Sequence, residues 1–151
     1  MTASHDRKPS TLYWALTLAL LLWALAGLAI YAAYVLETPE QFAAGAEDPA
    51  HRDAYADYVA NIPLWAIGAG VIAAACRFFG AIGLLLRRAW SAPFYVASLA
   101  FFLAALFRAF VLADVASVMS PRHIAIEFVF VGLSVFAIWF AYRCKAAGLL
   151  R

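Results

Sequence analysis

The stretch GVIAAACRFFGAIGLLLRR, from Gly70 to Arg88, decides the fold class of this chain. It is apolar enough to lie in a membrane, and the Arg87–Arg88 pair marks the water boundary at its end. Arg77, however, lies in the middle of the apolar run. An unpaired ion in hydrocarbon costs at least about 2.5 kcal/mol on insertion scales, so the position of Arg77 has to be explained.

The composition of the whole chain is typical of a membrane protein. Hydrophobic residues make up 67% of the 151 residues and charged residues only 13%, whereas soluble domains have about 45–50% and about 25%. The net charge of +2 is too small to indicate a nucleic-acid partner. We therefore expect a polytopic membrane protein whose main surroundings are the lipid bilayer.

Four apolar stretches are long enough to cross a hydrocarbon core, which takes about 20 helical residues. They cover residues 12–36, 63–86, 92–119 and 124–142, and they predict one integral membrane domain over residues 1–151. The first stretch exceeds the roughly 7–15 apolar residues of a signal peptide, so we expect it to remain as an anchor. Short connections make the last three spans antiparallel neighbours. The predicted fold is therefore all-α, an antiparallel bundle of four transmembrane helices.

The lysine and arginine residues predict the orientation of this bundle. Only Arg52 and Arg122 lie on the side of the connections after the first and third spans. The other basic residues outside the spans lie on the side of the two termini: Arg7, Lys8, Arg87, Arg88, Arg143, Lys145 and Arg151. Because basic residues are enriched in cytoplasmic segments, we expect both termini in the cytoplasm.

The outer segment, residues 37–62, is acidic and carries helix-start signals. The sequence TPEQ, from Thr38 to Gln41, is a capping box with proline at the first helical position. Asp48–Pro49 repeats the pattern of a capping residue followed by proline. Four apolar or aromatic residues then recur at helical spacing: Tyr55, Tyr58, Val59 and Ile62. These features predict a short amphipathic helix that lies on the outer surface of the membrane that the bundle crosses.

Arg77 is predicted to face other helices and not lipid. The positions three, four and seven residues from it are nearly all small: Gly70, Ala73, Ala74, Gly80, Ala81 and Leu84. The opposite face carries bulky residues: Ile72, Phe79, Ile82 and Leu86. Small residues let neighbouring helices approach closely, so the face of Arg77 is the packed one.

Four charged residues are predicted to form an intramembrane cluster: Arg77, Arg108, Asp114 and Glu127. Their charges sum to zero, and the helical rise and the outward lean of Arg77 bring it toward Glu127 or Asp114. The partner of Arg108 remains open. The cluster has three interpretations: an ion pair that holds the bundle in register, carboxylates that reach the headgroups, or a path for a solute or proton.

The sequence shows no catalytic or metal-binding constellation. There is no nucleophile–base–acid arrangement, phosphate-binding loop or pair of haem-type histidines. His51 lies near Glu47, Asp48 and Asp53, but this spacing matches no ligand motif, and we interpret the segment as a solvated acidic loop. His123 is interpreted as a residue of an interfacial turn. We expect no catalytic residue, no metal and no cofactor.

Two further stretches of the sequence are distinctive: PLWAIGAG at Pro63 with the following FFGAIGLLLRRAWSAPFYVASLAFF up to Phe102, and the terminal AYRCKAAGLLR from Ala141 to Arg151. They resemble a group of small, uncharacterised bacterial inner-membrane proteins with four spans. The resemblance implies a bacterial inner-membrane location and an acidic outer segment that contains a sequence similar to TPEQ. Some members of the group are labelled sugar transporters. Its members usually carry a small or apolar residue where this chain has Arg77, so a shared function would not depend on Arg77.

Three functional classes follow from these observations. We expect a non-catalytic accessory or assembly component that works with a second copy or a membrane-protein partner. The alternative is a small oligomeric transporter, or a conduit for protons or solutes, that uses the charge cluster. A membrane enzyme acting on lipid or quinone is the least supported, because no nucleophile–base pair is visible.

Overall fold

The fold is an all-α bundle of four long helices, seen in a computed structural model that describes residues 9–151. The long helices are α1 (Thr11–Leu36), α4 (Leu64–Leu85), α5 (Ser91–Phe107) and α6 (Pro121–Ala146). A π-helical turn, η1 (Arg108–Leu112), continues α5. With this extension, all four helices are long and apolar enough to cross a membrane, which confirms the predicted fold class.

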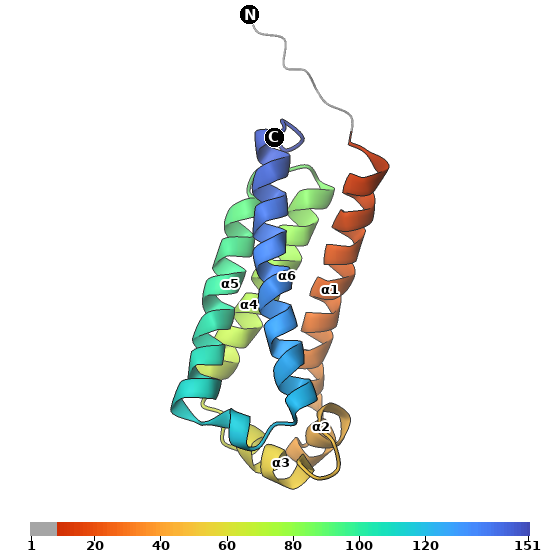
Figure 1. Cartoon of the computed structure of the whole chain (residues 1–151). Coiled ribbons are helices and arrows are strands. Elements are labelled where there is room, and N and C mark those ends of the chain that lie inside the picture. The colour runs from red at the N-terminus through yellow and green to blue at the C-terminus, as the bar shows by residue number, and fades with distance from the viewer. Residues whose placement is uncertain (1–8) are drawn as a thin grey trace, which may run out of the picture.

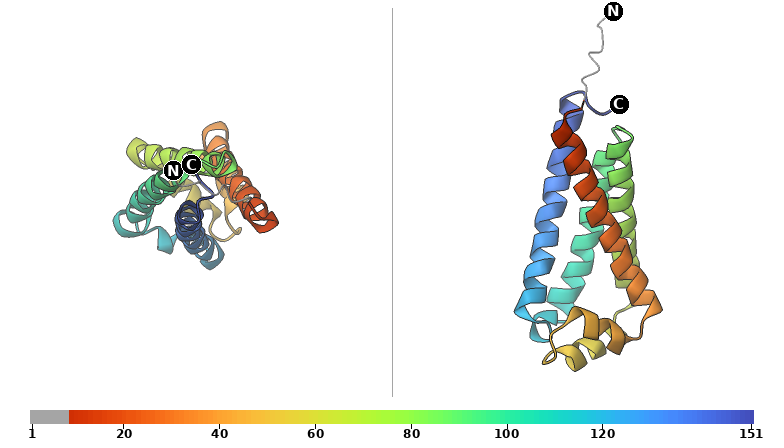
Figure 2. Two further views of the ribbon diagram at one scale, coloured as in Figure 1. Left: turned by 90° about the horizontal axis from the view of Figure 1, so that it is seen from above. Right: turned by 90° about the vertical axis from the view of Figure 1, so that its right-hand side faces the viewer.

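Two short helices close one end of the bundle, and the start of α1 and the C-terminus lie at the other end (Figure 1). The short helices are α2 (Pro39–Ala46) and α3 (Arg52–Ala60), and a 3-10 turn, η2 (Val115–Ser117), lies at the same end. Viewed along its axis, the bundle is a ring in the order α1, α4, α5 and α6 (Figure 2). Within this ring α4 packs closely against both α1 and α5, and α6 packs against α5.

Side-chain caps set several of the helix starts that the sequence predicted. Thr38 forms the expected capping box with Gln41, and Pro39 opens α2. Ser120 accepts a hydrogen bond from the backbone of His123 at the start of α6. The second predicted start is wrong, because Asp48–Pro49 leads into a turn and α3 begins only at Arg52. The outer segment therefore folds as two short helices instead of one.

The predicted third span ends earlier than expected. It was placed over residues 92–119, but the helix stops at Leu112 and Asp114 takes a left-handed conformation with φ of 44°. The reason is packing beyond the break. Val115 is fully buried and Met119 nearly so, against Ala43, Val59 and their neighbours in α2 and α3. A straight helix would carry Val115 and Met119 away from these partners.

The interior holds two separate apolar clusters. One lies toward the termini and includes Tyr13, Leu84, Tyr95 and Phe140. The other lies at the closed end and joins α2 and α3 to the segment around Val115. The packed face of α4 connects these regions and is made largely of glycine and alanine, as the sequence predicted.

Candidate functional site

A cavity of about 550 Å³ lies inside the half of the bundle that α2 and α3 close, called here the closed half. We call it the central cavity. Its walls come from α1, α4, α5 with η1, and α6, while residues of α2 and α3 line its outer part. No buried member of the apolar cluster near the termini lines it. Its volume is in the range of about 300–1,000 Å³ that is typical of sites for small molecules.

Arg77 reaches the central cavity from α4 and is held there by aromatic rings. The residue is only 5% exposed, which confirms that it faces protein. Its guanidinium carbon lies 4.1 Å from the ring centre of Trp23 and 5.5 Å from that of Phe102. A Cβ atom at Gly27 would lie 3.2 Å from Nη1, so this glycine leaves room for the guanidinium. Such cation–π contacts attract a buried cation, but they leave its N–H groups to other acceptors.

Glu127 reaches the same cavity from α6. Its Oε1 lies 3.8 Å from Nε2 of His123, one turn earlier on the helix. Its Oε2 is buried and has no hydrogen-bond partner in the part of the chain that the structure describes, and the same is true of Nε of Arg77. The structure shows no hydrogen bond or ion pair that joins Arg77 to Glu127. The direct contact that the sequence predicted between these two residues is therefore not formed.

Arg108 lies at the start of the π-helical turn and contacts the linker between α3 and α4. Its Nη2 donates a hydrogen bond of 3.1 Å to the carbonyl of Asn61. Its guanidinium lies 4.7 Å from the ring centre of Tyr58. Its Nη1 is buried without a partner, and Arg108 also lines the central cavity. These contacts answer the question of its partner, and π-helical turns of this kind occur often at functional sites.

Asp114 does not belong to the buried cluster. Its side chain is exposed in the loop after η1, and it does not line the central cavity. The prediction that Asp114 lies inside a span is wrong because the helix ends two residues before it. Of the four predicted residues, the structure brings Arg77, Arg108 and Glu127 to one cavity.

A buried carboxylate that the sequence analysis missed lies beside this group. Glu47, at the end of α2, is 5% exposed. Its Oε1 lies 2.5 Å from Nδ1 of His123, and its Oε2 accepts a hydrogen bond of 3.2 Å from the backbone of Ser120. Glu47, His123 and Glu127 thus form a continuous row of ionisable groups from the α2 end to the cavity. Glu47 and His123 are 76 residues apart, so no local spacing could have indicated the contact.

These contacts decide the ionisation of Glu47. Burial is the largest single influence and opposes the charged form, but hydrogen bonds from Ser120 and the interaction with His123 together outweigh it. As a result the pKa of Glu47 is lowered from its ordinary value. The carboxylate is therefore charged at neutral pH.

Tyrosine side chains make up much of the polar lining at the closed end. Tyr31, Tyr34, Tyr55 and Tyr58 all line the cavity. The rings of Tyr55 and Tyr58 are stacked at 5.7 Å, and Tyr55 meets the ring of His123 edge to face at 5.2 Å. Burial is the main cause that raises the pKa of both Tyr55 and Tyr58. Their hydroxyl groups are therefore protonated at neutral pH and can donate hydrogen bonds.

Comparison of the chain with protein families, with curated proteins and with solved structures finds no match. The chemistry of the site is therefore the basis for a functional argument. Among residues 9–151 there is no group of three or more His, Cys, Asp or Glu side chains placed to hold a metal ion. The cavity is lined by three guanidinium groups (Arg77, Arg108 and Arg122), two carboxylates (Glu37 and Glu127), the imidazole of His123 and several phenols within mostly apolar walls. This set is suited to binding a small molecule.

Proposed function

We propose that this protein is a membrane-embedded binding protein that holds a small molecule with an acidic group in its central cavity. The observation that carries this proposal is Arg77, a buried guanidinium that faces a cavity and has no ion-pair partner among the described residues. Buried charges in membrane proteins are costly and are usually paired or functional. A guanidinium matches the planar geometry of a carboxylate and binds phosphate equally well.

The proposal favours the alternative that the sequence left open, in which the charged groups of the membrane interior contact a solute. The cavity belongs to the closed half of the bundle, and the apolar cluster toward the termini lies beyond it. We therefore propose entry from the α2–α3 half. The predicted role as an accessory or assembly component, alone or with a second copy, stays a prediction.

We also propose that the termini face the cytoplasm across a bacterial inner membrane. This orientation is supported by the basic residues that follow the end of α4 and lie in the last turn of α6, including Arg87, Arg88 and Arg143. The α2–α3 end would then face the periplasm, and the ligand would come from that side.

Native mass spectrometry of the purified protein tests the binding proposal. We expect wild-type protein in mild detergent to retain an additional small mass, and Arg77→Gln to lose it. Arg143→Gln is the matched control, because Arg143 is exposed near the cytoplasmic end of α6 and does not line the cavity. Equal occupancy of wild type and Arg77→Gln, or bare protein in both, would contradict the proposal.

A further inference from the structure

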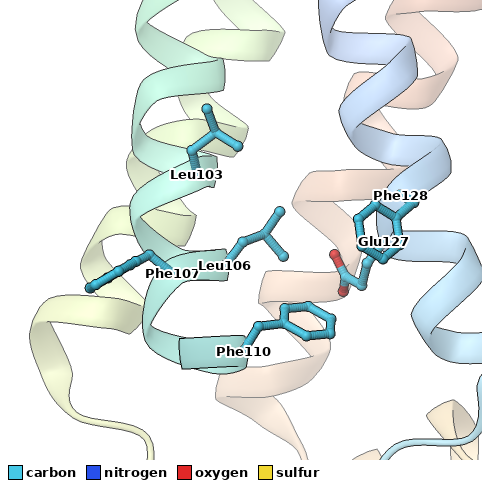
Figure 3. Close-up of a pocket in the computed structure, with 6 residues that line it drawn as sticks. All are labelled: Leu103, Leu106, Phe107, Phe110, Glu127 and Phe128. Carbon is cyan, nitrogen blue, oxygen red and sulfur yellow. The ribbon is translucent and has the colours of Figure 1, made fainter. Parts of the chain in front are cut away.

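A second, apolar pocket of about 290 Å³ lies between α5 and α6 (Figure 3). We call it the α5–α6 groove. Glu127 is its single charged residue, and the others are apolar: Leu103, Leu106, Phe107, Phe110 and Phe128. Leu103, Phe107 and Phe128 are 46%, 55% and 66% exposed. Because these residues belong to membrane-spanning helices, the groove opens toward lipid chains.

The groove and the central cavity share a wall. Leu106, Phe110 and Glu127 line both of them. In Figure 3 the carboxylate of Glu127 points from α6 toward Leu106 and Phe110 on the opposite side. The rings of Phe110 and Phe128 are 6.1 Å apart and bridge η1 and α6 at this place. A molecule in the groove would therefore have its polar end at Glu127 and next to the charged cavity.

The backbone of η1 supports a connection between the α5–α6 groove and the central cavity. Phe110 belongs to the π-helical turn, where the regular hydrogen bonding of α5 is interrupted. Such turns are typical of functional sites and of places where a helix wall changes shape. Phe110 thus lies in the least regular part of the wall between groove and cavity.

Two of the charges that line the cavity, Glu127 and Arg77, lie at different depths along the bundle. Glu127 lies six residues from the start of α6, about 9 Å of helix rise, whereas Arg77 lies thirteen residues from the start of α4, about 20 Å. Both helices start at the α2–α3 end, so the cation lies deeper than the carboxylate even though the Arg77 side chain leans outward. A ligand with both charges would fit this order with its anionic group at Arg77 and its cationic group at Glu127.

We propose that the central cavity takes the headgroup of a phospholipid that carries a primary ammonium group, with one acyl chain in the α5–α6 groove. The inference rests on the proposed function and names its ligand class. A ligand with only a phosphate would leave the Oε2 atom of Glu127 buried and unpaired. A ligand with only a cationic group would leave the Nε atom of Arg77 buried and unpaired. Phosphoethanolamine carries an anionic phosphate for Arg77 and an ammonium group that can donate hydrogen bonds to the carboxylate of Glu127. A trimethylated headgroup cannot donate them.

Competition between lipids with identical acyl chains tests the proposal. Protein in detergent is mixed with equal amounts of phosphatidylethanolamine and phosphatidylcholine, and the bound lipid is counted by native mass spectrometry. We expect wild type to prefer phosphatidylethanolamine at least fivefold, and Glu127→Gln to lose the preference. Equal binding of the two lipids to wild type would overturn the proposal.

A second pair of variants tests the groove without touching the charged residues. Leu103→Trp fills the groove from a residue that does not line the cavity, and we expect it to lower the bound phosphatidylethanolamine at least fivefold. Leu25→Trp is the matched control, since Leu25 is 44% exposed on α1 and lines neither pocket. Equal loss of lipid in both variants would contradict a chain in the groove.

Free phosphoethanolamine separates a lipid from a soluble ligand. We expect it to displace the bound lipid only weakly, because it lacks the acyl chain. If it binds wild type as tightly as the lipid and Arg77→Gln abolishes this binding, the lipid inference is wrong and the proposed function stands. If neither compound binds wild type better than Arg77→Gln, both fail.

Discussion

The Nδ1 atom of His123 lies 2.5 Å from Oε1 of Glu47, so the first turn of α6 is joined to the end of α2. The same carboxylate accepts a hydrogen bond from the backbone of Ser120. These contacts attach the α2–α3 segment to the bundle beside the central cavity. We expect these contacts of Glu47 to hold the α2–α3 segment over this end of the cavity.

We expect Glu47→Gln to lower the free energy of unfolding by about 1–3 kcal/mol, because the buried hydrogen bonds to a charged group lose their charge. Titration with SDS in mixed micelles measures this change. Glu40→Gln is the control, since Glu40 is exposed on the same helix, and it should have no effect. An equal loss in both variants would show that the buried contacts of Glu47 are unimportant.

The lowered pKa of Glu47 also predicts a dependence of stability on pH. A carboxyl group whose folded pKa is lower than its unfolded value stabilises the fold above the unfolded value, which is about 4.5 here. This contribution is lost as the pH falls from about 4.5 through the folded pKa. Thermal unfolding between pH 7 and pH 3 should therefore show a steeper loss for wild type than for Glu47→Gln. Parallel curves would contradict this account.

Gly83 is required by the close approach of α4 to the start of α5. A Cβ atom there would lie 2.8 Å from Cβ of Ser91 and 3.0 Å from its Cα. Because backbone atoms cannot easily move aside, we expect Gly83→Ala to cost about 1–3 kcal/mol. Gly68→Ala has open space around it and should be neutral or stabilise α4 by up to about 1 kcal/mol. Thermal unfolding of the two variants gives the comparison, and a stable Gly83→Ala would show that the helices are farther apart.

Variants of Asp114 test whether this residue lies in the loop or in the predicted intramembrane cluster. In the loop, its left-handed backbone favours glycine, so Asp114→Gly should leave stability unchanged or raise it by up to about 1 kcal/mol. Asp114→Asn serves as the control for charge alone and should be neutral. A loss of several kcal/mol in both variants would place the carboxylate in a buried ion pair.

Local periodicity was sufficient to predict the direction of Arg77 and the four spans, except for the end of the third. The small residues around Arg77 recur at helical spacing, and packing against α1 and α5 follows from their size. The end of the third span was not predictable in this way. It depends on the burial of Val115 and Met119 against α2 and α3, which are distant in the sequence.

The charged site was only partly predictable for the same reason. Hydropathy identified Arg77, Arg108 and Glu127 as charges among apolar residues. It could not show that Arg77 would lie on Trp23 and Phe102 instead of forming an ion pair, because this depends on how four helices meet. Glu47 looked like one acidic residue among many in the outer segment, and only its contact with His123 distinguishes it.

The most direct test of the account is the free energy of unfolding of Arg77→Met, measured in SDS titration together with retention of bound lipid. Methionine is an apolar side chain of similar length, and among residues 9–151 Arg77 has no ion-pair partner that the substitution would leave behind. We expect stability within about 1 kcal/mol of wild type, or higher, with bound lipid lost. A loss of about 3–5 kcal/mol with lipid still bound would show that Arg77 is a structural ion-pair residue and would contradict the account.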